Sequence, residues 1–516
     1  MRHEIKLIRN NGFKWHSEEG MHIKGYVYLK GNFIDNSAAL DFLRLSSGKD
    51  DFIKRVLQLN GCFSIVAEIN GGVMVVSDTT RSFPLFYSKK DGCIFISDEA
   101  EELVRLTGHR KINHNGLMDY LHSCCVFFDE TLIDEIYQVS AMCYMFYDFE
   151  TGSIEHNKYK TIYNVEYTVT CKEKMKEYLD VLFKNAAVRL VDSLRGRTAV
   201  VALSGGIDSR ACLMMLHMMG YKDVICFTYG WRNCAEEEPA RKAAERLGYK
   251  YIFIPHKRRD WKRTYKDNKS LEYIRYSGNM SSIAHMETHY VLRQLLDEGK
   301  IPNDSVVITG HIGLVASSKF KVGSEYKKEE IMEMFWEYWA KLYPYKGKRK
   351  DFYKKRFSRY FPSDGPFSYK DAERIFENAS FDSVRSKHII NYHRLFEMYG
   401  LEWRMPLMDY EFMSGFEKIQ PGIRDKEKTV FTEYVLDYTG RDIELAEVGL
   451  SFLSKAYRNL RNPVYGIITP WRFFFSGYKN ALLPPFPIRQ YRFIRRFYSY
   501  CALQEIKLIK KWINEN

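Results

Sequence analysis

The sequence lacks any uninterrupted apolar run long enough to cross a bilayer, and its mean hydropathy is −0.39. A transmembrane helix needs about 20 consecutive, mostly apolar residues, so the pattern argues against an ordinary membrane-spanning helix. The first residues, 1–6, also lack the apolar core of a signal peptide. We therefore expect a cytoplasmic location.

The cysteines lack the spacing of a metal site. There are 10 in the chain of 516 residues; Cys124 and Cys125 are adjacent, whereas Cys212, Cys226 and Cys234 are farther apart. Structural zinc sites use closely spaced cysteine or histidine pairs. We expect reduced, mostly buried thiols.

Recognisable nucleic-acid-binding motifs are absent as well. The net charge is +13, from 78 basic and 65 acidic residues. The basic residues concentrate in 346–356 and 489–511, outside any helix-turn-helix, zinc-finger or aromatic RNA-binding motif. We expect no nucleic-acid partner, because a basic exterior also suits a site for polyanionic ATP.

The chain is long and apolar enough for at least two globular domains, with 45% hydrophobic and 15% aromatic residues. Up to about residue 165, short β-like runs such as 63–69, 73–77 and 94–97 are separated by glycine-containing turns. This pattern predicts an antiparallel-sheet domain.

The most informative stretch is residues 201–210, which read VALSGGIDSR. An apolar run breaks into a glycine pair and resumes as a helix-like segment, a pattern that predicts strand, tight loop and helix. Glycines permit close approach of a phosphate, and serine hydroxyls and helix N-terminal N–H groups can donate to it. Asp208 is placed to bind Mg²⁺ beside bound phosphates. The alternative is a purely structural turn.

Further strands at 224–230, 251–254 and 305–310 alternate with a helix at 236–248. The alternation predicts a doubly wound parallel sheet with its ligand at the carboxyl ends of the strands. Tyr229 falls at such an end, where it either contacts adenine or only packs the strand. The residues expected to contact the nucleotide are Ala202, Leu203, Ser204, Gly205, Gly206, Asp208, Ser209, Tyr229, Thr309 and Gly310.

The Ser-Gly-Gly-Ile-Asp-Ser hexad resembles the pyrophosphate loop of ATP pyrophosphatases, which cleave ATP to AMP and pyrophosphate. The resemblance implies that ATP and Mg²⁺ bind here. We expect Asp208→Ala to abolish Mg²⁺-dependent nucleotide binding and Glu236→Ala, on the next helix, to leave it unchanged.

The N-terminal region resembles the glutaminase-type, Ntn-hydrolase-like domain of asparagine synthetases in segments 59–64 (LNGCFS), 77–87 (SDTTRSFPLFY) and 96–99 (ISDE). Glutaminase activity in that family needs a nucleophilic cysteine at the second position, where this chain has Arg2. Cys62 is interpreted as a core thiol. The resemblance therefore implies a retained fold without glutamine hydrolysis.

A second match, residues 399–412 (YGLEWRMPLMDYEF), resembles the asparagine-synthetase signature. Alternation along an extended segment puts Glu402 and Arg404 on one side, where they either form a buried ion pair or position a substrate. Asp409, after Pro406, suits a helix cap. The family includes β-lactam synthetases and lasso-peptide cyclases, which use a substrate amine in place of glutamine.

The chain departs from the family at two places. Residues 311–316 (HIGLVA) lack the acidic pair that follows the family strand, so metal binding would depend on Asp208, the phosphates and water. The catalytic lysine is absent from 443–451, which leaves Lys428 and Lys455 as candidates. His311 is either a base or a hydrogen-bonding residue. The expected catalytic residues are Lys428, Glu402 and Arg404.

Residues 461–516 form a basic, aromatic extension without a counterpart in the family. Its helical face, Leu503, Ile506, Ile509 and Trp512, either packs against the synthetase domain or docks on a membrane surface or protein partner. A homodimer is a further expectation.

These observations predict a glutaminase-like domain over 1–165, an α/β ATP pyrophosphatase domain over 170–460 and the extension. The resemblance implies a ligase that activates a carboxylate as an acyl-adenylate, which ammonia or a substrate amine then attacks. The alternative is a catalytically silent, nucleotide-binding subunit, favoured by the missing acidic pair and lysine.

Overall fold

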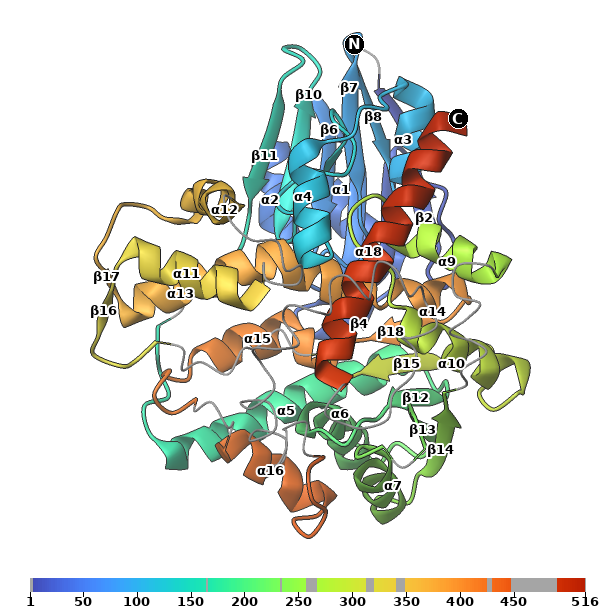
Figure 1. The fold of residues 1–516 in the computed structure, drawn as a ribbon, viewed down its shortest axis with the longest axis vertical. Helices are drawn as coiled ribbons and strands as arrows, with labels where there is room; N and C mark the ends of the chain where they lie inside the picture. The colour runs from blue at the N-terminus through green and yellow to red at the C-terminus, as the bar shows by residue number, and fades with distance from the viewer. Residues whose placement is uncertain are drawn as a thin grey trace, which may run out of the picture.

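The computed structural model describes residues 3–163, 166–232, 234–256, 267–311, 320–339, 349–424, 429–446 and 490–515. An upper domain formed by the N-terminal part of the chain sits on a lower domain that carries a parallel sheet (Figure 1). No helix in these ranges is long and apolar enough to cross a membrane.

The N-terminal domain contains two β-sheets. One has the strand order β1-β8-β7-β9, and the other β11-β10-β6-β5-β3-β2, with β4 paired to β3. All pairs are antiparallel except β1 with β8, which is parallel. The strands are β1 His3–Lys6, β2 Trp15–Glu18, β3 Met21–Leu29, β4 Asn32–Ile34, β5 Leu59–Ile69, β6 Gly72–Ser77, β7 Phe86–Lys90, β8 Cys93–Ser97, β9 Tyr137–Gln138, β10 Cys143–Asp148 and β11 Ile154–Lys158.

Apolar side chains on both faces of these strands produce a four-layer arrangement. Val66 and Val75 of the larger sheet pack with Tyr87 and Ile96 of the smaller sheet between the two. On the outer faces lie one pair of helices each. These are α1 Asn36–Arg44 and α2 Lys49–Val56 on the larger sheet, and α3 Ala100–Thr107 and α4 His114–Ser123 on the smaller. The antiparallel-sheet domain predicted from the sequence is confirmed.

The second domain contains the predicted parallel sheet. Its five strands are β12 Ala199–Ala202, β13 Val224–Gly230, β14 Lys250–Pro255, β15 Val306–Thr309 and β18 Glu402–Arg404. They are ordered β14-β13-β12-β15-β18 and all are parallel. Helices α6 Ile207–Met218 and α7 Glu237–Arg246 lie on one face of the sheet, and α9 Asn268–Gly278 and α10 Met286–Asp297 lie on the other (Figure 1). The doubly wound fold is confirmed.

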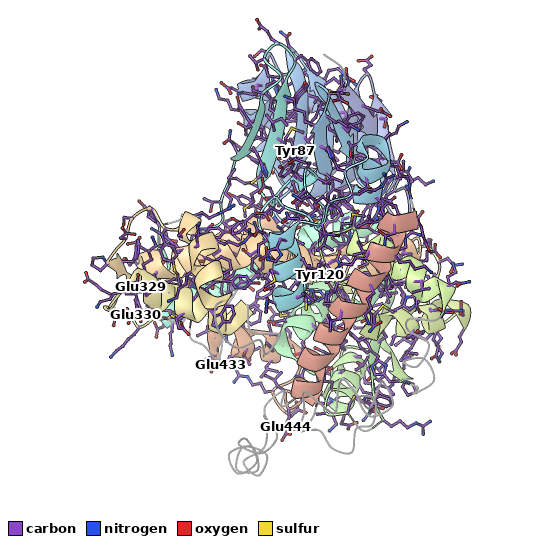
Figure 2. All side chains as sticks on the ribbon, turned by 45° about the horizontal axis from the view of Figure 1, so that its top comes forward. Tyr87, Tyr120, Glu329, Glu330, Glu433 and Glu444 are labelled. Atoms are coloured by element: carbon purple, nitrogen blue, oxygen red, sulfur yellow. The ribbon has the colours of Figure 1, made fainter. Side chains whose placement is uncertain are left out.

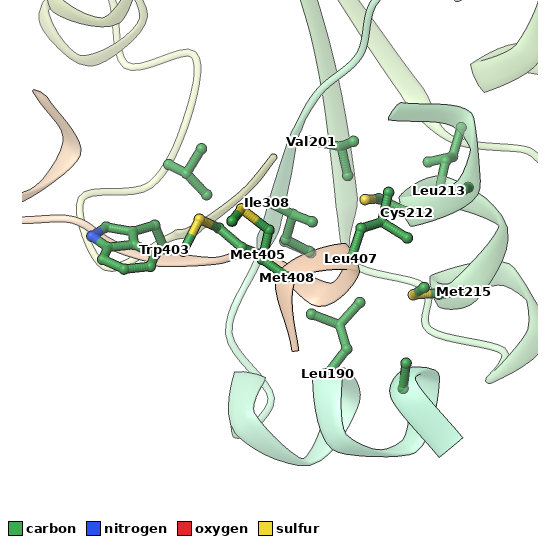
Figure 3. Close-up of a cluster of buried hydrophobic side chains, with 14 of the residues drawn as sticks. Leu190, Val201, Cys212, Leu213, Met215, Ile308, Trp403, Met405, Leu407 and Met408 are labelled. Carbon is green, nitrogen blue, oxygen red and sulfur yellow. The ribbon is translucent and has the colours of Figure 1, made fainter. Parts of the chain in front are cut away.

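One part of the hydrophobic core of this domain lies between the sheet and α6. Val201 of β12 and Ile308 of β15 face Cys212 and Met215 of α6, next to Leu190 of α5 (Figure 3). The other helices that the structure describes in this domain, apart from the lobe below, are α5 Lys172–Leu194, α14 Arg394–Met398, α15 Tyr410–Glu417 and α16 Thr429–Thr439. The short 3₁₀ turn η3 is Pro406–Met408.

A helical lobe between β15 and β18 packs against the N-terminal domain through Phe127 and Phe128. It consists of β16 Glu325–Tyr326, α11 Lys328–Trp339, α12 Arg349–Phe357, η1 Ser358–Tyr360, β17 Phe367–Ser368, α13 Tyr369–Ser380 and the π-helix η2 Phe381–Ile389.

The C-terminal helix α18, Gln490–Glu515, lies across both domains (Figure 1). Of the predicted apolar face, Ile506 and Trp512 are buried and Leu503 and Ile509 are half-buried. Ile506, Ile509 and Trp512 pack with residues of α3, α4 and the segment near Ile283. The helix therefore contacts the N-terminal domain as well as the parallel-sheet domain.

Candidate nucleotide site

The nucleotide loop connects β12 to α6 and is closed by its two serines. Ser209 Oγ accepts from the Ser204 N–H at 3.0 Å and lies 3.0 Å from Ser204 Oγ. Ser204 Oγ in turn accepts from the Gly206 N–H at 3.2 Å. Gly206 is the N-cap of α6 and provides no side-chain cap, so the first N–H groups of the helix have no acceptor inside the helix. This is the geometry of an anion cradle.

The neighbouring strands hold the start of this loop by its backbone. Ala202 pairs in register with Phe227 on β13 and with Thr309 on β15. The Leu203 N–H donates to Phe227 O at 2.9 Å, and its carbonyl accepts from Thr228 Oγ1. Leu203 therefore positions the loop, and its N–H is already used.

Gly310 lies directly against the N-terminus of α6. A Cβ atom at this position would lie 2.6 Å from both the nitrogen and the Cα of Ser209. Only glycine permits that approach without displacement of the helix start. The end of β15 and the nucleotide loop thus form one surface. Contact of Thr309 and Gly310 with a nucleotide stays a prediction.

A segment far along the chain covers the loop. The Ala446 N–H donates to Gly205 O at 3.0 Å, and a Cβ on Gly205 would lie 2.3 Å from Ala446 Cβ. Arg210, buried in α6, donates to the carbonyl oxygens of Ile443 and Glu444 at 3.0 and 2.6 Å. Arg210 was not singled out from the sequence, because its partners lie more than 230 residues away.

Glu236 also lies at the loop. Its Cα would be 3.1 Å from a Cβ on Gly205, and no described residue ion-pairs with or hydrogen-bonds to its carboxylate. Burial raises the pKa of this carboxyl group. Glu236 therefore lies at the loop and is unsuitable as the distant control residue that we expected from the sequence.

Histidine and tyrosine rings surround the ends of β13 and β15. Thr309 Oγ1 lies 2.8 Å from His393 Nε2, and the Thr288 hydroxyl donates to the Tyr229 hydroxyl at 2.9 Å. His311 contacts the rings of Tyr392 and His393, with centroids 4.8 and 5.2 Å away. Burial lowers the pKa of His311 to about 4, so its ring is neutral at physiological pH. No local sequence pattern pointed to His393, which is 84 residues from Thr309.

Glu402 and Arg404 pair with each other at 2.9 Å on β18, one of the two arrangements left open by the sequence. Arg404 also donates to Ser193 and to the Trp403 carbonyl. It lines a small cavity at the domain contact, together with Tyr26, Cys62, Arg189 and others, none of them from the nucleotide loop. A catalytic role for Glu402 or Arg404 stays a prediction.

Asp409 is the helix cap that was predicted. Its carboxylate accepts from the Phe412 N–H at 3.0 Å and pairs with Arg189 at 2.7 Å. Lys428 and Lys455, the candidate catalytic cations, lie outside the described residues, as do 312–316 of the loop after His311.

Cys62 is a core thiol on β5, as predicted. It is buried, and burial raises its pKa to about 12. None of the nine cysteines whose side chains the structure describes forms a disulfide, and six of these nine are buried.

The described residues at the loop could bind a divalent cation only together with the phosphates of a bound nucleotide. Within the described ranges, no three histidine, cysteine, aspartate or glutamate side chains are grouped to hold a metal. Asp208 and Glu236 are the acidic residues at the loop. Mg²⁺ typically uses one or two carboxylates plus substrate phosphates and waters, and these residues suit that arrangement.

The parallel sheet and its glycine loop define an ATP pyrophosphatase-type domain. A family model described as "Queuosine biosynthesis protein QueC" matches residues 198–288, from just before β12 to the start of α10. The match includes the nucleotide loop but not β15 or the N-terminal domain.

Two curated proteins named 7-cyano-7-deazaguanine synthase are similar over 53 residues, or 10% of this chain. The one from Myxococcus xanthus (strain DK1622) is 43% identical, and the one from Dechloromonas aromatica (strain RCB) is 42% identical. The chain spans only 23% and 24% of the lengths of these relatives.

Among solved structures, the glutamine phosphoribosylpyrophosphate amidotransferase from B. subtilis, complexed with ADP and GMP, aligns with 60% of this chain and 65% of its own. The sequence identity is 11% and the TM-score 0.20.

Proposed function

We propose that this protein is an ATP-dependent ligase that forms an amide bond. A carboxylate attacks the α-phosphate of ATP, which gives an acyl-adenylate and releases pyrophosphate. Ammonia or a substrate amine then attacks the acyl carbon and AMP leaves. The observation that carries the proposal is the contact of Gly310 with the first turn of α6, because it joins the phosphate loop and a second strand end into one surface.

The phosphate-binding role belongs to the loop. The Gly205 and Gly206 backbone, the Ser204 hydroxyl and the N–H groups at the start of α6 would hold the phosphates. Asp208 and Glu236 would hold Mg²⁺, which when bound neutralises phosphate charge. Tyr229, at the end of β13, would contact the adenine.

Arg210 acts through another segment and is a positioning residue. Its two hydrogen bonds fix residues 443 and 444, so that Ala446 lies on Gly205.

A second candidate function is nucleotide binding without catalysis. One observation favours it: the side chain seated directly on the glycine loop is the apolar Ala446. A regulatory or assembly subunit would bind ATP there and release no AMP.

The first test measures Mg²⁺-dependent ATP affinity by calorimetry. We expect Asp208→Asn to lower it by on the order of tenfold or more, because a lost contact to a charged group costs about 1.5–3 kcal/mol. Glu236→Gln should weaken binding in Mg²⁺ but not in EDTA. Glu238→Gln is the matched control, since Glu238 is exposed and pairs with Arg241. Equal affinities in Asp208→Asn and the parent would remove the basis for the site.

A further inference from the structure

Three buried cations meet where the N-terminal domain contacts the segment 381–398. Arg81, on the turn before β7, is 3% exposed, Lys387 is 1% exposed and Arg394 is 3% exposed. We call these three residues the interdomain basic cluster. Arg394 reaches the turn itself, because its Nη2 donates to the carbonyl oxygen of Ser82.

Two of the three cations have partners. Arg394 Nη2 lies 2.6 Å from Glu397 Oε1. Lys387 Nζ donates to the carbonyl oxygens of Val126, at 2.9 Å, and Phe128.

Arg81 differs from the other two. Its Nε and Nη2 atoms are buried, and no described residue accepts a hydrogen bond from either. The guanidinium carbon lies 5.8 Å from the Phe86 ring centroid, which offers a face but no counter-charge.

The carboxylate of Asp78 favours the charged form of Arg81, but neither Asp78 nor Glu397 accepts a hydrogen bond from Arg81 Nε or Nη2. Asp78 accepts from the N–H groups of Phe63, Thr80 and Ser82 at 2.9–3.0 Å, so its oxygens hold the turn together. Glu397 is used by Arg394 and by Trp403 Nε1. A buried charge without a partner is strongly unfavourable, so this arrangement needs another anion.

Two further observations show that both the charge and the backbone conformation of Arg81 are unfavourable at this position. Burial and the nearby Arg394 lower the pKa of Arg81 to about 9, so it still carries its charge at neutral pH. Its φ of 57° lies in the left-handed region, which favours glycine. A strained residue bearing an unpaired charge at a domain contact points to a ligand.

We propose that the interdomain basic cluster binds a small anion, a halide or a carboxylate group, with Arg81 as its principal donor. The bound anion would accept from Arg81 Nε and Nη2 and balance the charge shared with Lys387 and Arg394. It would fix the segment 381–398 against the turn 78–82. The same segment carries His393, which contacts Thr309 at the nucleotide site, so the anion would also steady that strand end.

The site can be tested on the full chain by thermal unfolding at fixed ionic strength. The reference buffer contains sodium HEPES as its sole, bulky anion, and chloride, bromide, acetate or phosphate is then titrated in. We expect a saturable rise in Tm of several degrees with the halides, with acetate, or with both. A halide-only response identifies an inorganic ion, and an acetate-only response identifies a carboxylate ligand. A response to phosphate alone would contradict a small-anion site.

Arg81→Gly should abolish this rise. In the reference buffer the variant should unfold at or above the parental Tm, because glycine adopts the backbone angle and leaves no buried charge. Arg441→Ala is the matched control: Arg441 is exposed and pairs with Asp437, so the rise should remain. The proposal is wrong if the parent shows no rise, or if Arg81→Gly responds like the parent.

A second measurement needs no variant. Crystals of the parent soaked in bromide should give an anomalous-scattering peak within about 3.5 Å of Arg81 Nη2, the contact range of a halide with an N–H donor. Bromide peaks confined to the protein surface would overturn the proposal.

Discussion

Gly310 shows how a single residue connects two elements of the nucleotide site. The α6 helix starts so close to β15 that even a methyl group would meet the Ser209 backbone at 2.6 Å. The close contact explains why a small residue stands at this strand end, whatever the ligand.

We predict that Gly310→Ala lowers ATP affinity by on the order of tenfold, because overpacking costs about 1–3 kcal/mol and here displaces the phosphate-binding turn. Calorimetric titration with ATP measures the affinity of the variant and of the parent. Gly48→Ala is the control, since a Cβ at Gly48 meets no atom within 4 Å. Unchanged ATP affinity in Gly310→Ala would show that the loop does not bind the phosphates.

The sequence predicted the parts of the site that are contiguous in the chain. The loop 204–209 and the strand ends at Tyr229 and Gly310 follow from local patterns of glycine and apolar residues. Glu236 and His393 could not be assigned in this way, because only the folded chain brings them beside Gly205 and Thr309. Arg210 follows the loop directly, but its partners, residues 443 and 444, are distant in sequence.

At the scale of elements, α18 is held by a buried carboxyl group. Tyr120 of α4 donates its hydroxyl to Glu505 at 2.7 Å, and Figure 2 shows Tyr120 beside this helix. The Ala284 N–H also donates to Glu505, at 3.3 Å. Near the end of the same helix, the guanidinium groups of Arg105 and Arg275 lie over the ring of Trp512. Glu505 and Trp512 thus fix α18 on both domains.

We predict that Glu505 makes stability depend on pH. Burial raises its pKa from 4.5 to about 8, so the folded state holds a proton that the unfolded chain releases. Stability should therefore fall as the pH rises from about 4.5 to 8, by at most about 1.4 kcal/mol per pH unit. Thermal unfolding across this range measures the slope.

Glu505→Gln should reduce that slope and raise the Tm at pH 8, because the amide stays neutral in place of the carboxyl group. Glu515→Gln, at the exposed end of the same helix, should behave like the parent. Parallel pH profiles for Glu505→Gln and the parent would contradict the assignment.

At the scale of the whole molecule, the two domains share a core. Trp403 of β18 is fully buried between Phe13 and Phe83 of the N-terminal domain, whose ring centroids lie 5.6 and 5.5 Å away. The His393 ring also contacts the Trp403 ring, and their centroids are 4.6 Å apart. The N-terminal domain therefore braces the edge of the parallel sheet, a role that needs no glutaminase chemistry.

We predict that Trp403→Ala costs about 3–5 kcal/mol, because it removes a large buried side chain from both domains at once. Chemical denaturation followed by circular dichroism should show one lower-midpoint transition. Leu45→Ala, which truncates a side chain 71% exposed, should leave the midpoint unchanged. A Trp403→Ala variant as stable as the parent would mean that the domains are held together elsewhere.

We propose that the loop 204–209 directs cleavage of ATP between the α- and β-phosphates. The most direct measurement incubates the full chain with Mg²⁺, a panel of carboxylates and ATP labelled at the α-phosphate, and separates the products. We expect labelled AMP with pyrophosphate, dependent on a carboxylate and lost in Asp208→Asn. Release of ADP and phosphate, or ATP binding without any AMP across the panel, would contradict it.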